Sequence, residues 1–560
     1  MRIMTYVASL TALLSVGYVV GELFAQTPST ALQPSSQEAP AAHGGAARLF
    51  ETSDVCLACH NGVTTALGED ISIGFDWRAS MMANAARDPY WQAAVRREIT
   101  DHPQAREAIE DKCSTCHMPI ARYSAHLTGG TGEVFGSLPR YGADPQLAAD
   151  ALDGVSCSVC HQIAESNLGS PESFTGGFEV DEHTGSGERT IYGPFEVDDG
   201  RVRLMQSASG FRPEESPHIQ SSELCASCHT LYTHALDEDG NEVAELPEQV
   251  PYLEWLHSDY REDQSCQSCH MPVVQGEAPI TSVLGQPRPE VSRHVFRGGN
   301  FFMLRMLNRY RNELGVTALP QELDAAAKRT VDHLRTSTAR MRVEDARRTG
   351  DGLAFDVVVE NLAGHKLPTA YPSRRVWLHV RVRDSSGQVV FESGALRPDG
   401  SIVGNDADAD PDAYEPHHTV VRSAEQVQIY ESIMGDASDR PTTGLMSGVR
   451  YLKDNRILPA GFDKVTADPD IAVEGTAYDD TDFVGGEDRT RYELSLDGSS
   501  EPLTIEASLW YQPIGYRWAR NLDDYTDAFE PERFVRYYDD MASGSAVRVV
   551  EVETSVGTPR

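Results

Sequence analysis

The stretch Cys56-Leu57-Ala58-Cys59-His60 is the first of five copies of one pattern, in which two cysteines separated by two residues are followed at once by histidine. The other copies are Cys113-Ser-Thr-Cys116-His117, Cys157-Ser-Val-Cys160-His161, Cys225-Ala-Ser-Cys228-His229 and Cys266-Gln-Ser-Cys269-His270. All ten cysteines of the 560-residue chain belong to these copies. Disulfides and zinc sites also use paired cysteines, but neither requires histidine after each pair.

The chemistry of haem attachment explains the spacing. Two thiols a helical turn apart can each form a thioether with one vinyl group of a haem, and the adjoining histidine then lies under the iron as its proximal ligand. The sequence therefore predicts five covalently bound c-type haems. Successive first cysteines lie only 41 to 68 residues apart, so the haems are expected to form much of the core and to exchange electrons with direct neighbours.

Each iron also needs a second axial ligand or an open position. Four histidines that flank the motifs are candidates, namely His126, His218, His257 and His294. For each of them, the alternative is an ordinary solvated or hydrogen-bonded imidazole. His365 lies in Gly364-His365-Lys366-Leu367-Pro368, a turn expected to present one imidazole to the haem region. For the first haem we expect Met82 as the second axial ligand, although a methionine at this position could instead pack in the core. His102 and His234 are further candidates.

Composition and pattern divide the chain into five segments. Residues 1–25 hold an apolar run typical of a secretory signal peptide, or of an uncleaved anchor because Leu23 is a poor cleavage signal. Residues 26–50 are Pro, Ser, Ala and Gln-rich and predict a disordered linker. Residues 51–299 are expected to form the pentahaem domain, mostly helical or irregular, with a helix over 79–100. Residues 300–341 predict a cap of two helices, 300–314 and 321–341.

Residues 342–560 predict a β-rich domain. Period-two alternation indicates strands, which we expect to form an antiparallel β-sandwich with long inserted loops at 400–418 and 464–500. The expected strands are 353–359, 375–383, 389–391, 504–510 and 547–553. The fold class is thus multidomain α + β. In one insert, Asp406, Asp408 and Asp410 alternate as calcium ligands do, although the loop lacks the glycine and closing glutamate of an EF-hand, and an acidic turn is the alternative.

The charge balance narrows the partners. The formal net charge is −37, which argues against nucleic acid or anionic lipid and fits a basic redox partner, a saline medium or simply a solvated surface. After residue 25 no apolar stretch is long enough to span a bilayer, so membrane contact is expected only through an uncleaved N-terminal segment. The sequence has no Gly-rich nucleotide loop, serine nucleophile elbow or HExxH helix, so catalysis other than by haem has no support.

Three stretches, 216–229, 265–272 and 364–369, resemble bacterial multihaem cytochromes, the broad group that includes hydroxylamine-oxidising and ammonia-forming nitrite-reducing members. The resemblance implies stacked haems, mostly with two histidine ligands, and some members are extracellular or form filaments. The chain departs from the group twice. It lacks the Cys-x-x-Cys-Lys motif of the nitrite reductases, and Ser80-Met81-Met82-Ala83 stands where many relatives have Ser-Met-His-Ala.

These observations predict an electron carrier that works between redox partner proteins in the periplasm or outside the cell. Two other functions remain open. One is an oxidoreductase with a single open iron acting on a small nitrogen, sulfur or oxygen species. The other is the protomer of a homo-oligomer or filament in which a neighbouring chain completes a haem, with His417 and His418 as candidate donors.

Overall fold

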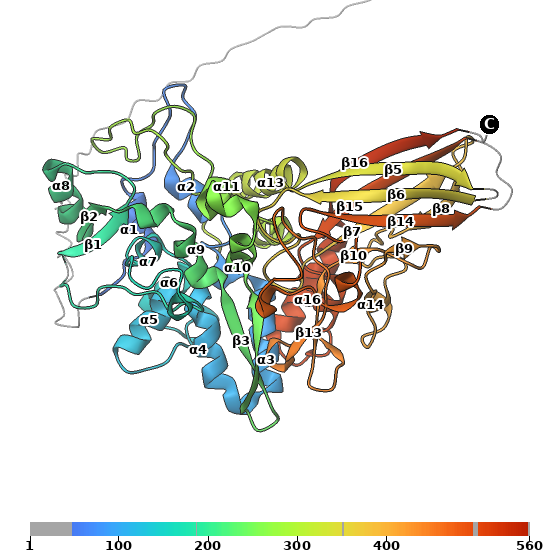
Figure 1. The fold of residues 1–560 in the computed structure, drawn as a ribbon. Coiled ribbons are helices and arrows are strands. Elements are labelled where there is room, and N and C mark those ends of the chain that lie inside the picture. Colours follow the sequence, from blue (N-terminus) through green and yellow to red (C-terminus); the bar gives the residue numbers. More distant parts are fainter. Residues whose placement is uncertain (1–47, 186, 350–351, 497–501, 558–560) are drawn as a thin grey trace, which may run out of the picture. The chain divides into compact units, whose positions relative to one another are not determined.

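The structure, a computed structural model, describes residues 48–185, 187–349, 352–496 and 502–557. The predicted signal peptide 1–25 and nearly all of the linker 26–50 lie outside these residues. The described residues belong to one compact unit (Figure 1). Within them, no helix combines the length and the apolar character that a membrane crossing requires.

The motif-bearing region, 51–299, is built from short helices. The Cys-x-x-Cys pairs lie on such helices or at their ends, so the thiols are a helical turn apart as expected. The helices are α1 (Ser53–Leu57), α2 (Ile73–Arg78), α3 (Pro89–Asp101), α4 (Arg106–His117), α5 (Pro119–Leu127), α6 (Pro145–Leu152), α7 (Cys157–Cys160), α8 (Asp199–Ser209), α9 (Ser222–His229), α10 (Pro251–Leu256) and α11 (Cys266–His270).

The helix predicted over 79–100 begins ten residues later than expected. The Asp88 carboxylate accepts the backbone N–H groups of Tyr90 at 2.8 Å and Trp91 at 3.2 Å, and Pro89 occupies the first turn of α3. A capping aspartate followed by proline is a strong helix start. Two small sheets in this region were not predicted, the parallel pair β1 (Arg189–Gly193) with β2 (Phe211–Glu215) and the antiparallel pair β3 (Leu231–Leu236) with β4 (Glu242–Gln249).

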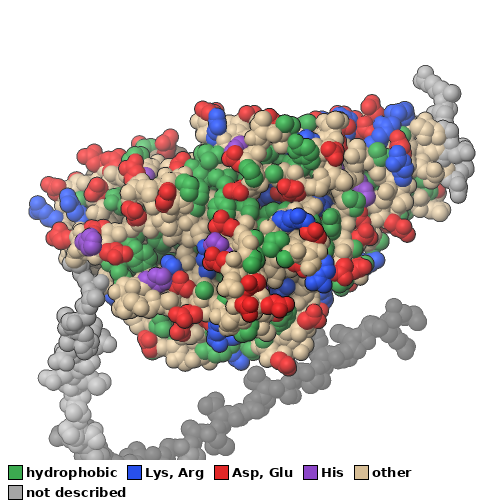
Figure 2. All heavy atoms as spheres, turned by 60° about the horizontal axis from the view of Figure 1, so that its bottom comes forward, with side chains coloured by type: hydrophobic (Ala, Val, Ile, Leu, Met, Phe, Trp, Pro, Cys, Tyr) green, Lys and Arg blue, Asp and Glu red, His purple; other side chains and the backbone are tan. Residues whose placement is uncertain are grey.

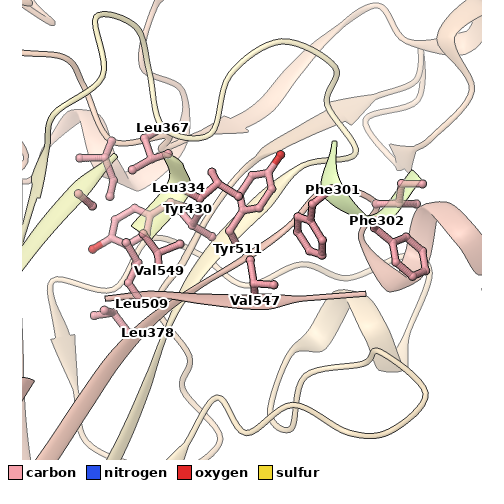
Figure 3. Close-up of a cluster of buried hydrophobic side chains, with 14 of the residues drawn as sticks. Phe301, Phe302, Leu334, Leu367, Leu378, Tyr430, Leu509, Tyr511, Val547 and Val549 are labelled. Atoms are coloured by element: carbon pink, nitrogen blue, oxygen red, sulfur yellow. The ribbon is translucent and has the colours of Figure 1, made fainter. Parts of the chain in front are cut away.

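Two cap helices follow as expected, α12 (Phe301–Arg309) and α13 (Pro320–Ser337). Figure 3 shows that Phe301, Phe302 and Leu334 of these helices lie in one buried cluster with strand residues such as Leu509 and Val547. The cap is therefore continuous with the core of the β-region. The boundary predicted at residue 341 falls inside a strand, because β5 (Ala339–Thr349) begins two residues after α13 ends.

The β-region contains two principal sheets. In one the order is β10-β7-β15-β16 with β8 beside β7, and in the other it is β5-β6-β14-β9. Phe391 of the first sheet packs edge-on against Tyr492 of the second, so the sheets face one another as in a sandwich. The bounds of the remaining strands are β6 (Gly352–Asn361), β7 (Arg375–Arg383), β8 (Val389–Ser393), β9 (Val420–Val421), β10 (Ile429–Tyr430), β14 (Glu487–Ser495), β15 (Leu503–Gln512) and β16 (Val547–Val556).

A smaller sheet, β12-β11-β13, and three helices complete the region. Their bounds are β11 (Ser432–Gly435), β12 (Pro441–Thr442), β13 (Arg450–Asp454), α14 (Asp406–Ala409), α15 (Tyr516–Arg520) and α16 (Phe529–Met541). All five predicted strands exist, but β14 lies where a loop was expected. Its buried positions include Asp488 and Thr490, so an alternation of burial is present without an alternation of hydrophobicity.

A buried ion pair ties β7 to α14. The Arg375 guanidinium forms two bonds to the Asp408 carboxylate, at 2.7 and 3.0 Å, and the two side chains are 4% and 1% exposed. Replacing Arg375 by Ala would strand a buried carboxylate, and we expect the free energy of unfolding to fall by roughly 3–5 kcal/mol.

Urea unfolding followed by circular dichroism measures this loss. Arg381→Ala is the matched control on the same strand, because the Arg381–Glu506 pair is partly exposed and its removal should cost about 1 kcal/mol or less. Equal losses in the two variants would contradict the role assigned to the buried pair.

Candidate functional site

Four of the five motif histidines have one ring nitrogen fixed by a backbone carbonyl. In each, Nδ1 lies within hydrogen-bond distance of that oxygen and must carry the proton. The pairs are His60 with Ile280 at 2.8 Å, His117 with Ala85 at 3.0 Å, His161 with Tyr192 at 2.6 Å and His270 with Arg297 at 2.5 Å. This tautomer leaves the Nε2 lone pair free, which is how axial and metal-bound histidines are oriented.

Burial keeps these imidazoles in the neutral form that can bind a metal. Desolvation lowers the pKa of all five motif histidines, and it lowers the pKa of His117 and His270 to about 4. The His117 ring also stacks on Trp91, with the ring centroids 4.3 Å apart. The residues present therefore fit a haem in charge state at all five motifs and in ring orientation at the four whose histidine has Nδ1 fixed by a carbonyl.

Thiols of different motifs lie in contact, which places the attachment sites next to one another. A hydrogen bond to Cys157 lowers the pKa of the Cys56 thiol, one to Cys225 lowers the pKa of Cys266 to about 7, and one with Cys228 raises the pKa of Cys116. The Cys160 thiol further raises the pKa of Cys225. The first site thus neighbours the third, the fourth neighbours the second and fifth, and the third neighbours the fourth.

His365 comes from the β-region and lies opposite the last motif. Its ring centroid is 6.3 Å from that of His270, with 15° between the ring planes, and its Nδ1 donates to the carbonyl of Lys366 at 2.9 Å. Two imidazoles bound to one metal through nitrogens about 2 Å from it have ring centroids about 6 Å apart. His270 and His365 therefore stand at the spacing of a bis-imidazole pair.

A second histidine pair has the same spacing. The ring centroids of His161 and His294 are 6.2 Å apart, with 21° between the planes. Burial lowers the pKa of the His294 imidazole to about 3, although a backbone hydrogen bond with Ser292 acts to raise it. His294 is thus held neutral beside the third motif.

Sequence reasoning missed His333, on α13. Its ring centroid is 6.2 Å from that of His270, at 68°, and its buried Nδ1 lacks a partner among the described residues. The signal was a histidine beside the apolar stripe of a helix that was predicted to form part of the cap.

Two other predicted ligands, His126 and His218, have Nε2 bonded to protein groups, whereas Nε2 of His257 has no hydrogen bond among the described residues. Nε2 of His126 lies 2.6 Å from Asp111, and both nitrogens of His218 are bonded, Nε2 to the carbonyl of Ile163 at 2.8 Å and Nδ1 to Ser216 Oγ at 2.7 Å. His257 donates from Nδ1 to Leu253 at 2.8 Å and has Nε2 3.6 Å from Asp468.

Met82 lies beside the third motif. Its carbonyl accepts the N–H of Val155 at 3.0 Å, two residues before Cys157.

The calcium prediction does not fit the geometry. Both carboxylate oxygens of Asp408 bond to Arg375, and Oδ2 also accepts the N–H of Ile402 at 2.8 Å. Asp406 and Asp410 are not buried with it. The acidic run forms the short helix α14, which a buried arginine holds through Asp408, rather than the acidic turn that was the alternative to calcium binding.

A different group, His417, Asp480 and Asp488, is buried and close enough to hold a metal ion. However, Nδ1 of His417 faces two amide donors, Gln428 Nε2 at 2.9 Å and Asn455 Nδ2 at 3.1 Å. Nδ1 must therefore be unprotonated, so Nε2 carries the proton and donates it to Asp480 at 3.1 Å.

This arrangement has two consequences. A metal at Nε2 would need an imidazolate, so the group does not fit a metal site through histidine. A buried and fully bonded His417 also cannot serve as a donor to a neighbouring chain, and Nε2 of His418 is bonded to Glu415 at 2.6 Å. The prediction of His417 as a filament donor is thus corrected, and His418 stays a prediction.

Comparisons with known proteins give a likeness of fold. No family model matches the chain, and no curated protein matches it. Among solved structures, the chain is similar to a penta-heme cytochrome c552 from Thermochromatium tepidum, with 15% identity and a TM-score of 0.51 over 91% of this chain and 100% of that one. At this identity the similarity shows a shared fold.

Removal of loosely bound metal tests the reading of the His417 group. Because Nδ1 of His417 accepts from two amides, we expect the group to bind no metal. Dialysis against a chelator should then leave the melting temperature unchanged within about 1 °C. Added Zn²⁺ or Ca²⁺ should leave it unchanged too, since an ion that does not bind the native state cannot stabilise it. Differential scanning calorimetry measures this. The tautomer assignment would be contradicted if the melting temperature rose with metal concentration and this rise disappeared in His417→Asn.

Proposed function

We propose that the chain is an exported multihaem c-type cytochrome that binds five haems covalently and carries electrons between redox partner proteins in the periplasm or outside the cell. The observation that carries the proposal is the combination found at the motifs. The cysteine pairs lie on helical turns, and four motif histidines have Nδ1 fixed by a carbonyl. Thiol hydrogen bonds join the first site to the third and the fourth site to the second and fifth. The fold shared with a penta-heme cytochrome supports it.

The protein's own groups have defined roles in this proposal. Each cysteine pair anchors one haem, and each motif histidine offers Nε2 to its iron in a fixed orientation. A bound haem would supply a one-electron ferric/ferrous couple. The buried walls around the histidines exclude water and keep the imidazoles neutral. Contacts between neighbouring sites make short electron steps available through the interior.

The second axial ligands favour a carrier over an enzyme. His365 and His294 stand at bis-imidazole spacing from His270 and His161, and an iron closed by two imidazoles has no position for substrate. Acidic side chains are spread over the face shown in Figure 2 rather than gathered at one place. The net charge favours a redox partner with a positively charged surface, and the spread of acidic side chains does not mark one docking face.

One observation favours a second function. Among the described residues, His60, His117 and His229 have no imidazole ring at comparable distance. An iron at one of these motifs could keep an open position and act on a small nitrogen, sulfur or oxygen species.

Electron paramagnetic resonance of the fully oxidised protein separates the two functions. For a carrier we expect low-spin signals only, which do not change when nitrite, hydroxylamine or cyanide is added. Optical spectra recorded on the same samples provide the control for ligand access. A high-spin signal that converts on adding one of these ligands would overturn the carrier assignment in favour of an enzyme.

A further inference from the structure

The loop that carries His365 is held by a glutamate from the motif-bearing region. Glu254 lies on α10, between the fourth and fifth motifs, and its side chain is fully buried. Its Oε2 accepts the backbone N–H of Lys366 at 3.0 Å and the hydroxyl of Thr369 at 2.5 Å. One carboxylate oxygen therefore fixes both Lys366, the residue after His365, and Thr369 further along the same loop.

The same glutamate belongs to a chain of four buried charges. Oε1 of Glu254 is 2.8 Å from Arg456 Nη1. Arg456 in turn forms two bonds to Asp454, at 2.8 and 2.6 Å, and Asp454 accepts from Lys366 Nζ at 2.7 Å. Two positive and two negative charges alternate, so the buried cluster is neutral overall.

The charges compensate one another strongly. Burial acts to raise the pKa of Asp454, but Arg456 and Lys366 hold it at about 2. Removing one member would leave an uncompensated charge in the interior, where its field is poorly screened. The cluster adjoins the His365 loop through Lys366, and the His365 ring lies 6.3 Å from the His270 ring.

Further bonds hold the rest of the loop in place. Asn361 Nδ2 donates to the carbonyl of His365 at 2.8 Å, and the Tyr260 hydroxyl donates to the carbonyl of Leu362 at 2.9 Å. Leu367 exchanges backbone bonds with Ile457, both at 2.9 Å. Glu254 and Lys366 both join the His365 loop to the charged cluster, and Glu254 is the partner that comes from the motif-bearing region.

We propose that Glu254 is a positioning residue that holds His365 as the axial ligand of the fifth iron, and that it does so within a buried cluster, with Arg456, Asp454 and Lys366, that carries no net charge. The inference rests on the proposed function, since it requires a haem at the fifth motif. It assigns to α10 a role in ligand geometry that goes beyond packing.

Two variants test the proposal on the intact haem protein. Glu254→Gln keeps the size of the side chain and removes its charge. The cluster then carries one net positive charge, which favours the reduced iron. We expect one of the five redox transitions to shift to higher potential and part of one low-spin resonance to become high-spin. Thr369→Val removes only the hydroxyl bond to Glu254 and should give a smaller change of the same resonance.

Asp408→Asn is the matched control, because it breaks an equally buried carboxylate–arginine pair in the sandwich. It should lower the melting temperature as Glu254→Gln does, while all resonances and potentials stay unchanged. If Glu254→Gln and Thr369→Val behave like this control, the positioning role is overturned and the proposed function stands. If Glu254→Gln does not fold, Thr369→Val decides alone.

His365→Ala separates the inference from its premise. With His365 as ligand, this variant converts one iron to high spin, and added imidazole restores the low-spin signal. A full set of five haems with an unchanged spectrum in His365→Ala would overturn the ligand assignment and the role of Glu254 with it. Loss of covalent haem in the unmodified protein would instead overturn the proposed function itself.

Discussion

The orientation of the motif imidazoles depends on a hydrogen bond that the motifs do not contain. Nδ1 of His60 reaches the carbonyl of Ile280, which is 220 residues away, and Nδ1 of His117 reaches Ala85, 32 residues earlier. A Cys-x-x-Cys-His turn fixes the thiols and the backbone of its histidine, but it leaves the ring free to rotate. At four motifs the tertiary fold supplies the acceptor that fixes the ring and its tautomer, so the ligand orientation proposed for these sites depends on folding.

At the last motif, the β-region likewise supplies a residue that is distant in sequence, His365, which lies beside His270. It does not stand apart as a separate domain, because the cap helices α12 and α13 share one buried core with its strands. That continuity gives the His365 loop a rigid support on one side, and α10 holds it on the other through Glu254. In the proposed arrangement, a ligand from a region so distant in sequence makes the geometry of the fifth site depend on the fold of the β-region.

The sequence predicted what depends on local pattern. The five motifs, the strands 353–359 and 375–383 and the two cap helices follow from spacing and periodicity, and His365 was singled out by the glycine and proline around it. What it could not predict depends on tertiary contact. Strand β14 was missed because Asp488 and Thr490 face inward and are satisfied by distant partners such as Tyr430. His333 and Glu254 have the sequence pattern of ordinary helix residues. Nothing in the sequence of the acidic segment indicates that Asp408 forms a buried ion pair with Arg375.

The central claim is that covalent haems are attached at all five motifs, and the mass of the intact mature protein tests it most directly. The protein should be produced in a host that attaches c-type haem, and the mass should be measured under denaturing conditions that remove non-covalent ligands. The account predicts one species that carries five covalently bound haems. A mass equal to the bare polypeptide, or to the polypeptide with its ten thiols paired as disulfides, would contradict it.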